Sequence, residues 1–227
     1  MNIKNKLTII IPARNEEESL GKLLRKFRKY NKFYKEIIVI DGQSDDKTKD
    51  IAKSNKCIVV KQTNLGYGSA IIQGVNKVKT KYFIVFDADG SKDPIYLKRF
   101  INKLKYEENG IIFAERYGKN AGSLDDTFLT FIGNRIFTIL GKFLFKLKLN
   151  DILHTFFLCK TSTFKKIKFK YKDFVFCVEF PILAKKKYIN CSFIPTIEKK
   201  RYDGVPKVRS FSDGLKILIG MINLYFN

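Results

Sequence analysis

The chain has 227 residues, a hydrophobic content of 45% and a formal net charge of +22. This length and composition predict one folded domain with a sizeable core and exclude a mainly disordered chain. The charge is compatible with nucleic acid, an anionic membrane surface or a phosphorylated substrate as partner, and equally with a general enrichment in lysine.

The first half alternates strand and helix signals. Strands are predicted at residues 7–11, 37–40, 57–60, 82–87 and 111–114, and helices at 15–27 (capped by Asn15), 45–54, 69–78 and from Pro94 onward. Repeated strand–helix–strand units indicate an α/β fold with a mostly parallel central sheet and helices on both faces. Ligands of such sheets bind at the carboxyl ends of the strands.

The second half is less regular. We predict helices at 127–149, at 178–186 despite Pro181, and at 213–226, with strands at 155–159 and 188–197. The segment 127–149 has two interpretations. As a core helix it closes the domain. As a membrane-interface helix it turns apolar side chains toward acyl chains and lysines toward head groups (Phe131, Ile132, Phe143 and Leu144; Lys142, Lys146 and Lys148).

Histidine and cysteine limit the available chemistry. The single histidine, His154, disfavours a Ser-His-Asp triad and a histidine-rich metal site, and we expect it to pack in the core. The four cysteines form no C-x-x-C pair, which indicates buried thiols in a reducing compartment. No signal peptide is recognised, and no apolar run reaches the roughly 18 residues that span a bilayer.

The strand predicted at 82–87 ends in two carboxylates, Asp87 and Asp89. Two carboxylates this close repel each other unless a cation lies between them, and a divalent ion sharing its shell with substrate phosphates meets that need. The alternative is a solvated turn before the helix at Pro94.

Polar clusters follow two other strands, at residues 12–16 and 41–46. If the strands are parallel, all three clusters lie at one edge of the sheet. Helix N-termini favour phosphate, and carboxylates favour a metal ion or sugar hydroxyls. A nucleoside diphosphate with a divalent ion satisfies both, although each cluster alone is also typical of a capped turn.

Four motifs together resemble family 2 glycosyltransferases of GT-A fold. They are Ile-Pro-Ala-Arg-Asn-Glu-Glu (11–17), Val-Ile-Asp-Gly-Gln-Ser-Asp-Asp-Lys-Thr (39–48), Asn-Leu-Gly-Tyr-Gly-Ser-Ala (64–70) and Phe-Asp-Ala-Asp-Gly (86–90). More narrowly, the chain resembles polyprenyl- or dolichyl-phosphate sugar synthases. Weaker matches extend this likeness over nearly the whole chain (Glu115-Arg116-Tyr117, Asn134-Arg135, Asp151, Glu179 and residues 200–207).

The resemblance implies a single domain, residues 1–227, with a nucleotide-sugar half (1–118) and an acceptor half (119–227). It implies a donor site formed by Pro12, Ala13, Arg14, Glu16, Asp41, Gln43, Gly68, Asp87, Ala88 and Asp89. Asp87 and Asp89 would bind Mg²⁺ or Mn²⁺, and phosphates would be contacted by Arg116, Arg135, Arg201 and Lys207. Related synthases often carry glutamine two residues after the second aspartate, where this chain has Ser91.

The implied reaction is inverting transfer from a nucleotide-diphosphate sugar, GDP-mannose or a UDP-sugar, to a polyprenyl phosphate at the cytoplasmic face of a membrane. A phosphate acceptor is already anionic, so arginines suffice to position it. The alternative acceptor is a saccharide or lipid hydroxyl in cell-surface polysaccharide or glycolipid assembly, which needs a general base.

The expected catalytic residues are Asp89, Asp151 and Arg116. Asp151 is the first candidate for a general base, followed by Asp89 and Asp93, although Asp151 is also typical of an N-cap. A basic nucleic-acid-binding protein is the alternative of another class, and the chain carries no recognition motif for it.

Overall fold

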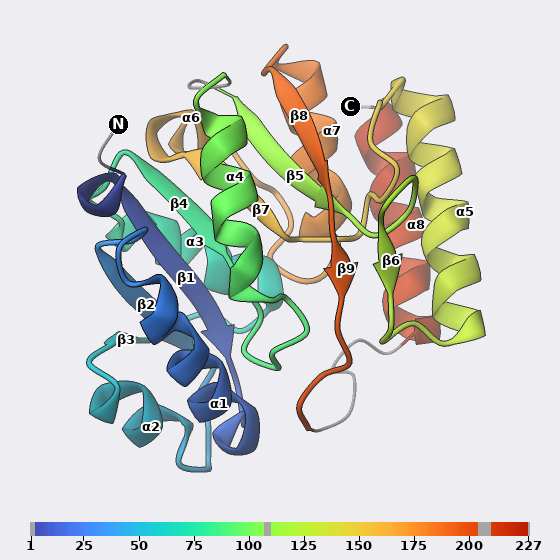
Figure 1. The fold of residues 1–227 in the computed structure, drawn as a ribbon. Coiled ribbons are helices and arrows are strands. Elements are labelled where there is room, and N and C mark those ends of the chain that lie inside the picture. Colours follow the sequence, from blue (N-terminus) through green and yellow to red (C-terminus); the bar gives the residue numbers. More distant parts are fainter. Residues whose placement is uncertain (1–2, 107–109, 204–209, 227) are drawn as a thin grey trace.

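A seven-stranded sheet runs through the molecule (Figure 1) in the order β3-β2-β1-β4-β7-β5-β8. The computed structural model describes residues 3–106, 110–203 and 210–226. The strands are β1 (Leu7–Ala13), β2 (Glu36–Asp41), β3 (Ile58–Lys61), β4 (Tyr82–Val85), β5 (Ile111–Glu115), β7 (Phe157–Lys160) and β8 (Cys191–Pro195). All neighbours pair in parallel except β7, which is antiparallel to both β4 and β5. The predicted, mostly parallel α/β sheet is confirmed.

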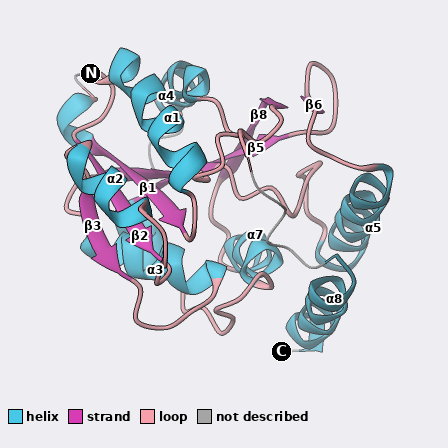
Figure 2. Cartoon of the chain, turned by 90° about the horizontal axis from the view of Figure 1, so that it is seen from below, coloured by secondary structure: helices cyan, strands magenta, loops and turns pink. Residues whose placement is uncertain are grey.

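Helices cover both faces of this sheet (Figure 2). One face packs against α1 (Glu17–Phe27), α2 (Thr48–Ser54) and α4 (Leu97–Leu104), and the other against α3 (Tyr67–Lys77), α6 (Thr161–Lys165) and α7 (Phe176–Lys186). Successive side chains of β1 serve opposite faces, since Ile9 joins the first core and Ile10 the second. This two-sided burial explains why the strand is apolar without alternation.

Two further helices, α5 (Phe128–Phe145) and α8 (Ser210–Phe226), lie side by side outside α7 (Figures 1 and 2). Their inner sides meet α7 in a third apolar cluster that includes Phe145, Val178, Ile182, Ile217 and Met221. Within the described chain, α5 is long and apolar enough to cross a membrane by length and composition alone, and it carries two charged residues, Arg135 and Lys142. The sequence-based expectation that no run reaches this length was therefore wrong.

Short elements complete the fold. They are the 3-10 turns η1 (Lys4–Lys6), η2 (Arg28–Tyr30) and η3 (Pro94–Tyr96), and a two-stranded parallel ribbon of β6 (Gly122–Ser123) and β9 (Ile197–Glu198). The predicted strand 188–197 is thus divided between β8 and β9.

Several predicted helix boundaries differ from the observed ones by two to four residues, and two of these differences have a clear structural cause. Asn15 does not cap α1, because its backbone has φ 52° and its side chain accepts a hydrogen bond from the Asp45 amide at 3.0 Å. The helix begins two residues later. The other boundary is the end of α5, which was expected at residue 149. The helix stops at Phe145 because Lys146 adopts the left-handed conformation, with φ 53°.

Candidate functional site

The first two polar clusters interlock at the carboxyl edge of β1 and β2. Ala13 lies opposite Asp41 in the sheet register. Beyond the strands, the Asn15 amide donates to Ser44 Oγ at 3.1 Å and the Glu16 amide to Thr48 Oγ1 at 2.7 Å. The structure therefore brings the first two clusters together, as the parallel strands predict.

Asp41 supplies an unused acceptor in this corner. Its side chain is buried, Oδ1 accepts from the Ser44 amide at 3.2 Å, and Oδ2 has no partner in the described structure. Buried polar atoms are rarely left unpaired, so Oδ2 is placed to receive a ligand's donor. Arg14 and Gln43 are exposed around Asp41, while Pro12 and Glu16 are half-buried and Ala13 is buried.

Asp87 is held by two protein donors. Tyr67 Oη donates to its Oδ1 at 2.8 Å, and Lys92 Nζ lies 2.7 Å from its Oδ2. Thr155 completes the group, with its Oγ1 2.5 Å from Tyr67 Oη. Sequence reasoning missed Tyr67, Lys92 and Thr155 as site residues. Two signals were available, namely the place of Tyr67 within the motif 64–70 and the position of Lys92, three residues after Asp89.

The glycines of the loop before α3 position Tyr67. A Cβ on Gly66, which has φ 123°, would meet the Lys172 carbonyl oxygen at 2.4 Å, and one on Gly68 would meet Phe176 Cβ at 2.5 Å. The Gly68 amide is also engaged, since it donates to the Asp173 carbonyl at 3.3 Å. In this structure Gly68 serves close packing, which allows the Tyr67 ring to stack on Phe174.

Asp89 has weaker protein partners than Asp87. Its Oδ1 accepts from the Ser91 amide at 2.9 Å, and its Oδ2 lies 3.8 Å from Arg201 Nη1. Burial, and then the charge of Asp87, raise the pKa of Asp89 to about 6. Both effects destabilise the ionised carboxylate, so a cation bound beside Asp89 would stabilise it. Ala88, between the two carboxylates, is buried in the core.

The Asp87–Asp89 pair fits a divalent ion only together with a substrate. The described residues contain no group of three or more histidine, cysteine or acidic side chains placed to hold a metal. Two carboxylates therefore leave most coordination positions to water and ligand oxygens, which is how Mg²⁺ is commonly bound beside phosphates.

The strand β9 and the residues after it cover the Asp87–Asp89 loop. The Tyr202 amide donates to the Asp89 carbonyl at 2.8 Å and the Lys199 amide to the Ser91 carbonyl at 2.9 Å. Arg201 pairs with Asp125, which links this cover to the segment before α5. Lys207, the fourth predicted phosphate contact, lies outside the described residues.

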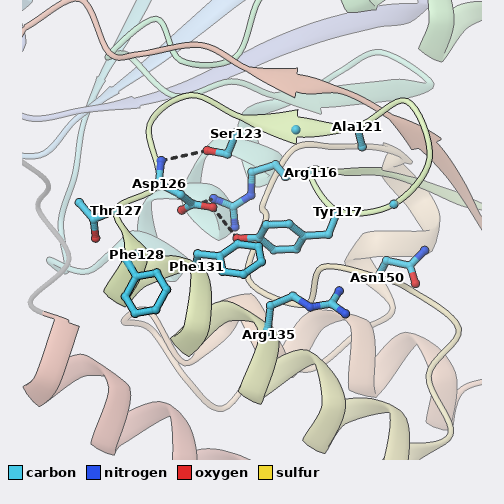
Figure 3. Close-up of a pocket in the computed structure, with 12 residues that line it drawn as sticks. Arg116, Tyr117, Ala121, Ser123, Asp126, Thr127, Phe128, Phe131, Arg135 and Asn150 are labelled. Atoms are coloured by element: carbon cyan, nitrogen blue, oxygen red, sulfur yellow. Dashed lines mark hydrogen bonds and ion pairs between the residues drawn. The ribbon is translucent and has the colours of Figure 1, made fainter.

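A pocket of about 690 Å³ opens between β6 and α5 (Figure 3). Arg116 lies at its inner wall, where Nε and Nη2 donate to Asp151 at 2.7 and 3.1 Å and Nη1 donates to Glu198 at 3.1 Å. Burial disfavours the charge of Arg116, but Asp151 and Glu198 raise its pKa well above its ordinary value. Arg116 is thus fully engaged with carboxylates, and the Asp151 side chain has no exposed surface.

Arg135 lines the same pocket with a different set of neighbours. Its guanidinium lies 5.8 Å from the centre of the Tyr117 ring, and no carboxylate partner is found for it within the described structure. The Tyr117 hydroxyl is held by Asp126 at 2.5 Å and by Asn134 at 2.9 Å. Of the three described arginines predicted to contact phosphate, Arg135 has the charge that the protein leaves uncompensated.

The contacts of His154 and Glu179 indicate that both residues serve the fold. His154 packs edge-on against Phe156, and burial, followed by the charges of Arg116 and Lys92, lowers its pKa well below the ordinary value. The imidazole is therefore neutral. The Glu179 carboxylate accepts from the backbone amides of Lys170 and Tyr171 at 2.7 and 3.0 Å, which fixes that loop.

Residues 8–168 match the family model described as Glycosyl transferase family 2. The chain belongs to this family. The resemblance seen in the four motifs is confirmed at that level.

Relatives of the family show similarity over parts of their length. AglJ, a glycosyltransferase of Haloferax volcanii, is 24% identical over 86% of this chain and 64% of its own. The uncharacterized protein MJ1222 of Methanocaldococcus jannaschii is 35% identical over 46% of this chain and 44% of its own. The chain thus spans less than two thirds of either relative.

Solved structures show the same fold over nearly the whole chain. Glucosyl-3-phosphoglycerate synthase from Mycobacterium tuberculosis, in complex with UDP, superposes with a TM-score of 0.79 at 13% identity, covering 98% of this chain and 80% of that one. Its complex with Mn²⁺, UDP and glucosyl-3-phosphoglycerate gives a TM-score of 0.78 at 13% identity, with the same coverage. The GT-A-like fold is confirmed.

Proposed function

We propose that this protein transfers a sugar, with inversion, from a nucleotide-diphosphate sugar to a polyprenyl or dolichyl phosphate at a membrane surface. The observation that carries the proposal is Arg135, an arginine without a carboxylate partner in the described structure, in a pocket beside an exposed apolar helix face. Residues 1–118 form the donor half and residues 119–227 the acceptor half.

The donor lies at the carboxyl edge of β1, β2 and β4. The free Oδ2 of Asp41 receives a donor group from the nucleoside, and Pro12, Ala13, Arg14, Glu16 and Gln43 surround it. The diphosphate extends toward Asp87 and Asp89. Glucosyl-3-phosphoglycerate synthase was solved with UDP and with UDP-glucose, which favours a UDP-sugar over GDP-mannose as the first donor to examine.

Asp87 and Asp89 would hold Mg²⁺ or Mn²⁺, ions that are present in complexes of that synthase. When bound, the ion neutralises negative charge on the departing diphosphate. The protein adds Arg201, whose guanidinium lies 3.8 Å from Asp89 and so borders the same phosphates.

A phosphate acceptor agrees with the surroundings of Asp151. Both of its carboxylate oxygens accept from Arg116, and its side chain is buried, so it has no free oxygen directed at the pocket. A hydroxyl acceptor needs a general base at this position, whereas an anionic phosphate does not. Asp151 then positions Arg116, and Arg135 binds the acceptor phosphate.

The outer faces of α5 and α8 support a lipid-linked acceptor. Large apolar side chains are exposed along both helices, namely Phe128, Leu129, Ile136, Ile139 and Phe143 on α5 and Phe211, Leu215, Ile219, Ile222 and Phe226 on α8. Exposed apolar side chains gathered along two adjacent helices favour an interaction site. Exposed lysines on and directly after α5, Lys142 and Lys146, favour anionic lipid head groups.

The test is transfer from radiolabelled UDP- and GDP-sugars to polyprenyl phosphate in the presence of Mn²⁺, with the product extracted into butanol. We expect label in the butanol phase with wild-type protein and its loss in Arg135→Ala. Arg99→Ala is the matched control, because Arg99 also stacks on a tyrosine, Tyr96, but outside the pocket. Label that is transferred only to water-soluble products would contradict the proposed acceptor.

A further inference from the structure

Lys92 is a lysine whose ammonium group is enclosed in the protein. Its side chain is only 1% exposed. Lysine is almost never fully buried unless it is paired, because removing its charge from water is costly. A specific set of acceptors must therefore hold it beside the donor site.

Three acceptors surround the ammonium group. Nζ lies 2.7 Å from Asp87 Oδ2, donates to the Thr155 carbonyl at 3.0 Å and lies 3.4 Å from Thr155 Oγ1. The Phe156 ring is 5.8 Å from Nζ. Because an ammonium group has three donors, this set satisfies Lys92 completely and fixes its position.

The two carboxylates of the pair are consequently unequal. Asp87 has Lys92 on one oxygen and Tyr67 on the other, so its charge is compensated and its orientation fixed by the protein. Asp89 has one backbone amide at 2.9 Å and a guanidinium group at 3.8 Å that is shared with Asp125. The unbalanced negative charge of the pair is therefore at Asp89.

We propose that Lys92 is a resident cation of the donor site. It neutralises Asp87 and thereby prevents tight binding of a divalent ion before the nucleotide diphosphate arrives. The inference rests on the proposed assignment of Asp87 and Asp89 to the donor's diphosphate and its metal. The nucleotide-free site presents one uncompensated carboxylate, and the diphosphate brings the negative charge and oxygen ligands that are missing. Metal and nucleotide then bind with strong positive coupling.

The direct test measures Mn²⁺ binding to nucleotide-free protein by electron paramagnetic resonance. Lys92→Gln removes the ammonium group that pairs with Asp87, so Asp87 becomes a second uncompensated carboxylate. Because affinity for the ion rises with the number of charged ligands, we expect the Mn²⁺ dissociation constant to fall by about tenfold or more. Lys199→Gln is the matched control, because Lys199 pairs with Asp93 outside the proposed metal ligands. Its Mn²⁺ affinity is expected to equal that of the wild type.

A charge-restoring double variant separates this role from a purely structural one. Asp87→Asn combined with Lys92→Gln has the net charge of the wild type, so its nucleotide-free Mn²⁺ affinity should return to the wild-type value. Unchanged or weaker Mn²⁺ binding in Lys92→Gln overturns the proposal, as does a double variant that binds Mn²⁺ as tightly as the single one.

If Lys92→Gln does not fold, thermal melting of the wild-type protein carries the test. Mn²⁺ alone should leave its melting temperature unchanged, whereas Mn²⁺ with UDP or GDP should raise it. Stabilisation by Mn²⁺ alone equal to that with nucleotide overturns the role of Lys92. Absence of stabilisation by any nucleotide with Mn²⁺ contradicts the proposed donor site instead.

Discussion

Arg116 and Asp151 form a two-point ion pair behind the pocket, with Nε donating to Oδ2 at 2.7 Å and Nη2 to Oδ1 at 3.1 Å. Replacing Asp151 by asparagine leaves a buried guanidinium without its main partner. Breaking a buried pair in this way costs about 3–5 kcal/mol. We expect Asp151→Asn to lose about that much stability in urea denaturation.

The same variant separates the two roles considered for Asp151. A general base acts on the reaction, so its loss would abolish turnover and leave stability unchanged. Asp45→Asn is the control, because Asp45 is exposed and its side chain makes none of the contacts described at the site. Wild-type stability in Asp151→Asn, together with lost turnover, would favour a hydroxyl acceptor.

Gly90 is expected to tolerate no side chain. Its φ is 82°, and a Cβ would come within 2.1 Å of the Tyr202 ring. Gly90→Ala therefore displaces the segment that covers Asp89, and it also carries the cost of about 1–2 kcal/mol for a left-handed alanine. We expect a lower melting temperature and weaker binding of UDP with Mn²⁺.

Gly133→Ala is the contrasting substitution. Gly133 lies within α5, and a Cβ there meets nothing within 4 Å. Alanine favours a helix over glycine by up to about 1 kcal/mol, so this variant should be as stable as the wild type or more stable. Equal losses in Gly90→Ala and Gly133→Ala would argue against the contact with Tyr202.

The carboxyl group of Asp89 should titrate near pH 6 in metal-free protein. Burial, and then Asp87, raise its pKa from 3.8 to about 6. Between about pH 4 and pH 6 the folded state holds a proton that the unfolded state has released, so this group's contribution to stability falls as pH rises through that window. Carboxyl-carbon NMR measures the midpoint directly.

Asp87→Asn removes the second cause of that shift. The midpoint of Asp89 should then move toward 3.8, and the stability loss between about pH 4 and pH 6 should shrink with it. Asp45→Asn should leave the midpoint where it is. An unchanged midpoint in Asp87→Asn would attribute the shift to burial alone.

The outer face of α5 can be tested for membrane contact by vesicle flotation. Ile139→Glu combined with Phe143→Glu places charges at two exposed positions. Because burying such side chains contributes about 1.5–3 kcal/mol each, we expect binding to anionic vesicles to weaken by more than about tenfold. Ile95→Glu with Tyr106→Glu alters two exposed apolar side chains on the α4 side of the sheet and should float normally. Equal flotation of both variants would argue against the interface.

Most of the fold could be predicted because burial on two faces imposes a local pattern. β1 and β4 are continuous apolar runs, and their ends were placed within about two residues of the observed bounds. The antiparallel direction of β7 could not be predicted, because a short apolar strand carries no local mark of direction. The end of α5 was missed because Lys146 adopts its left-handed conformation without a glycine or asparagine to indicate it.

The proposed donor site, formed by polar residues after β1, β2 and β4, could be predicted for a related reason, because polar residues directly after parallel strands meet at one edge of the sheet. The partners of Asp87 could not be predicted. Tyr67 and Thr155 are 88 residues apart and meet only through the tertiary fold. Only Ser91 was noted as a departure from the synthase pattern, and Lys92 was given no role, because its burial is a property of the folded molecule.

The reversed strand β7 has a consequence for how this fold can vary. The chain leaves the sheet after Glu115 at the end of β5 and re-enters it at Phe157 in the adjacent position. The segment between them, which carries Arg116, Arg135 and Asp151, starts and ends at neighbouring positions at one edge of the sheet. It can be lengthened, shortened or exchanged without changing the pairing of the seven-stranded sheet, provided that β6 keeps its pairing with β9. The proposed acceptor preference is therefore open to grafting between relatives while the proposed donor site stays intact.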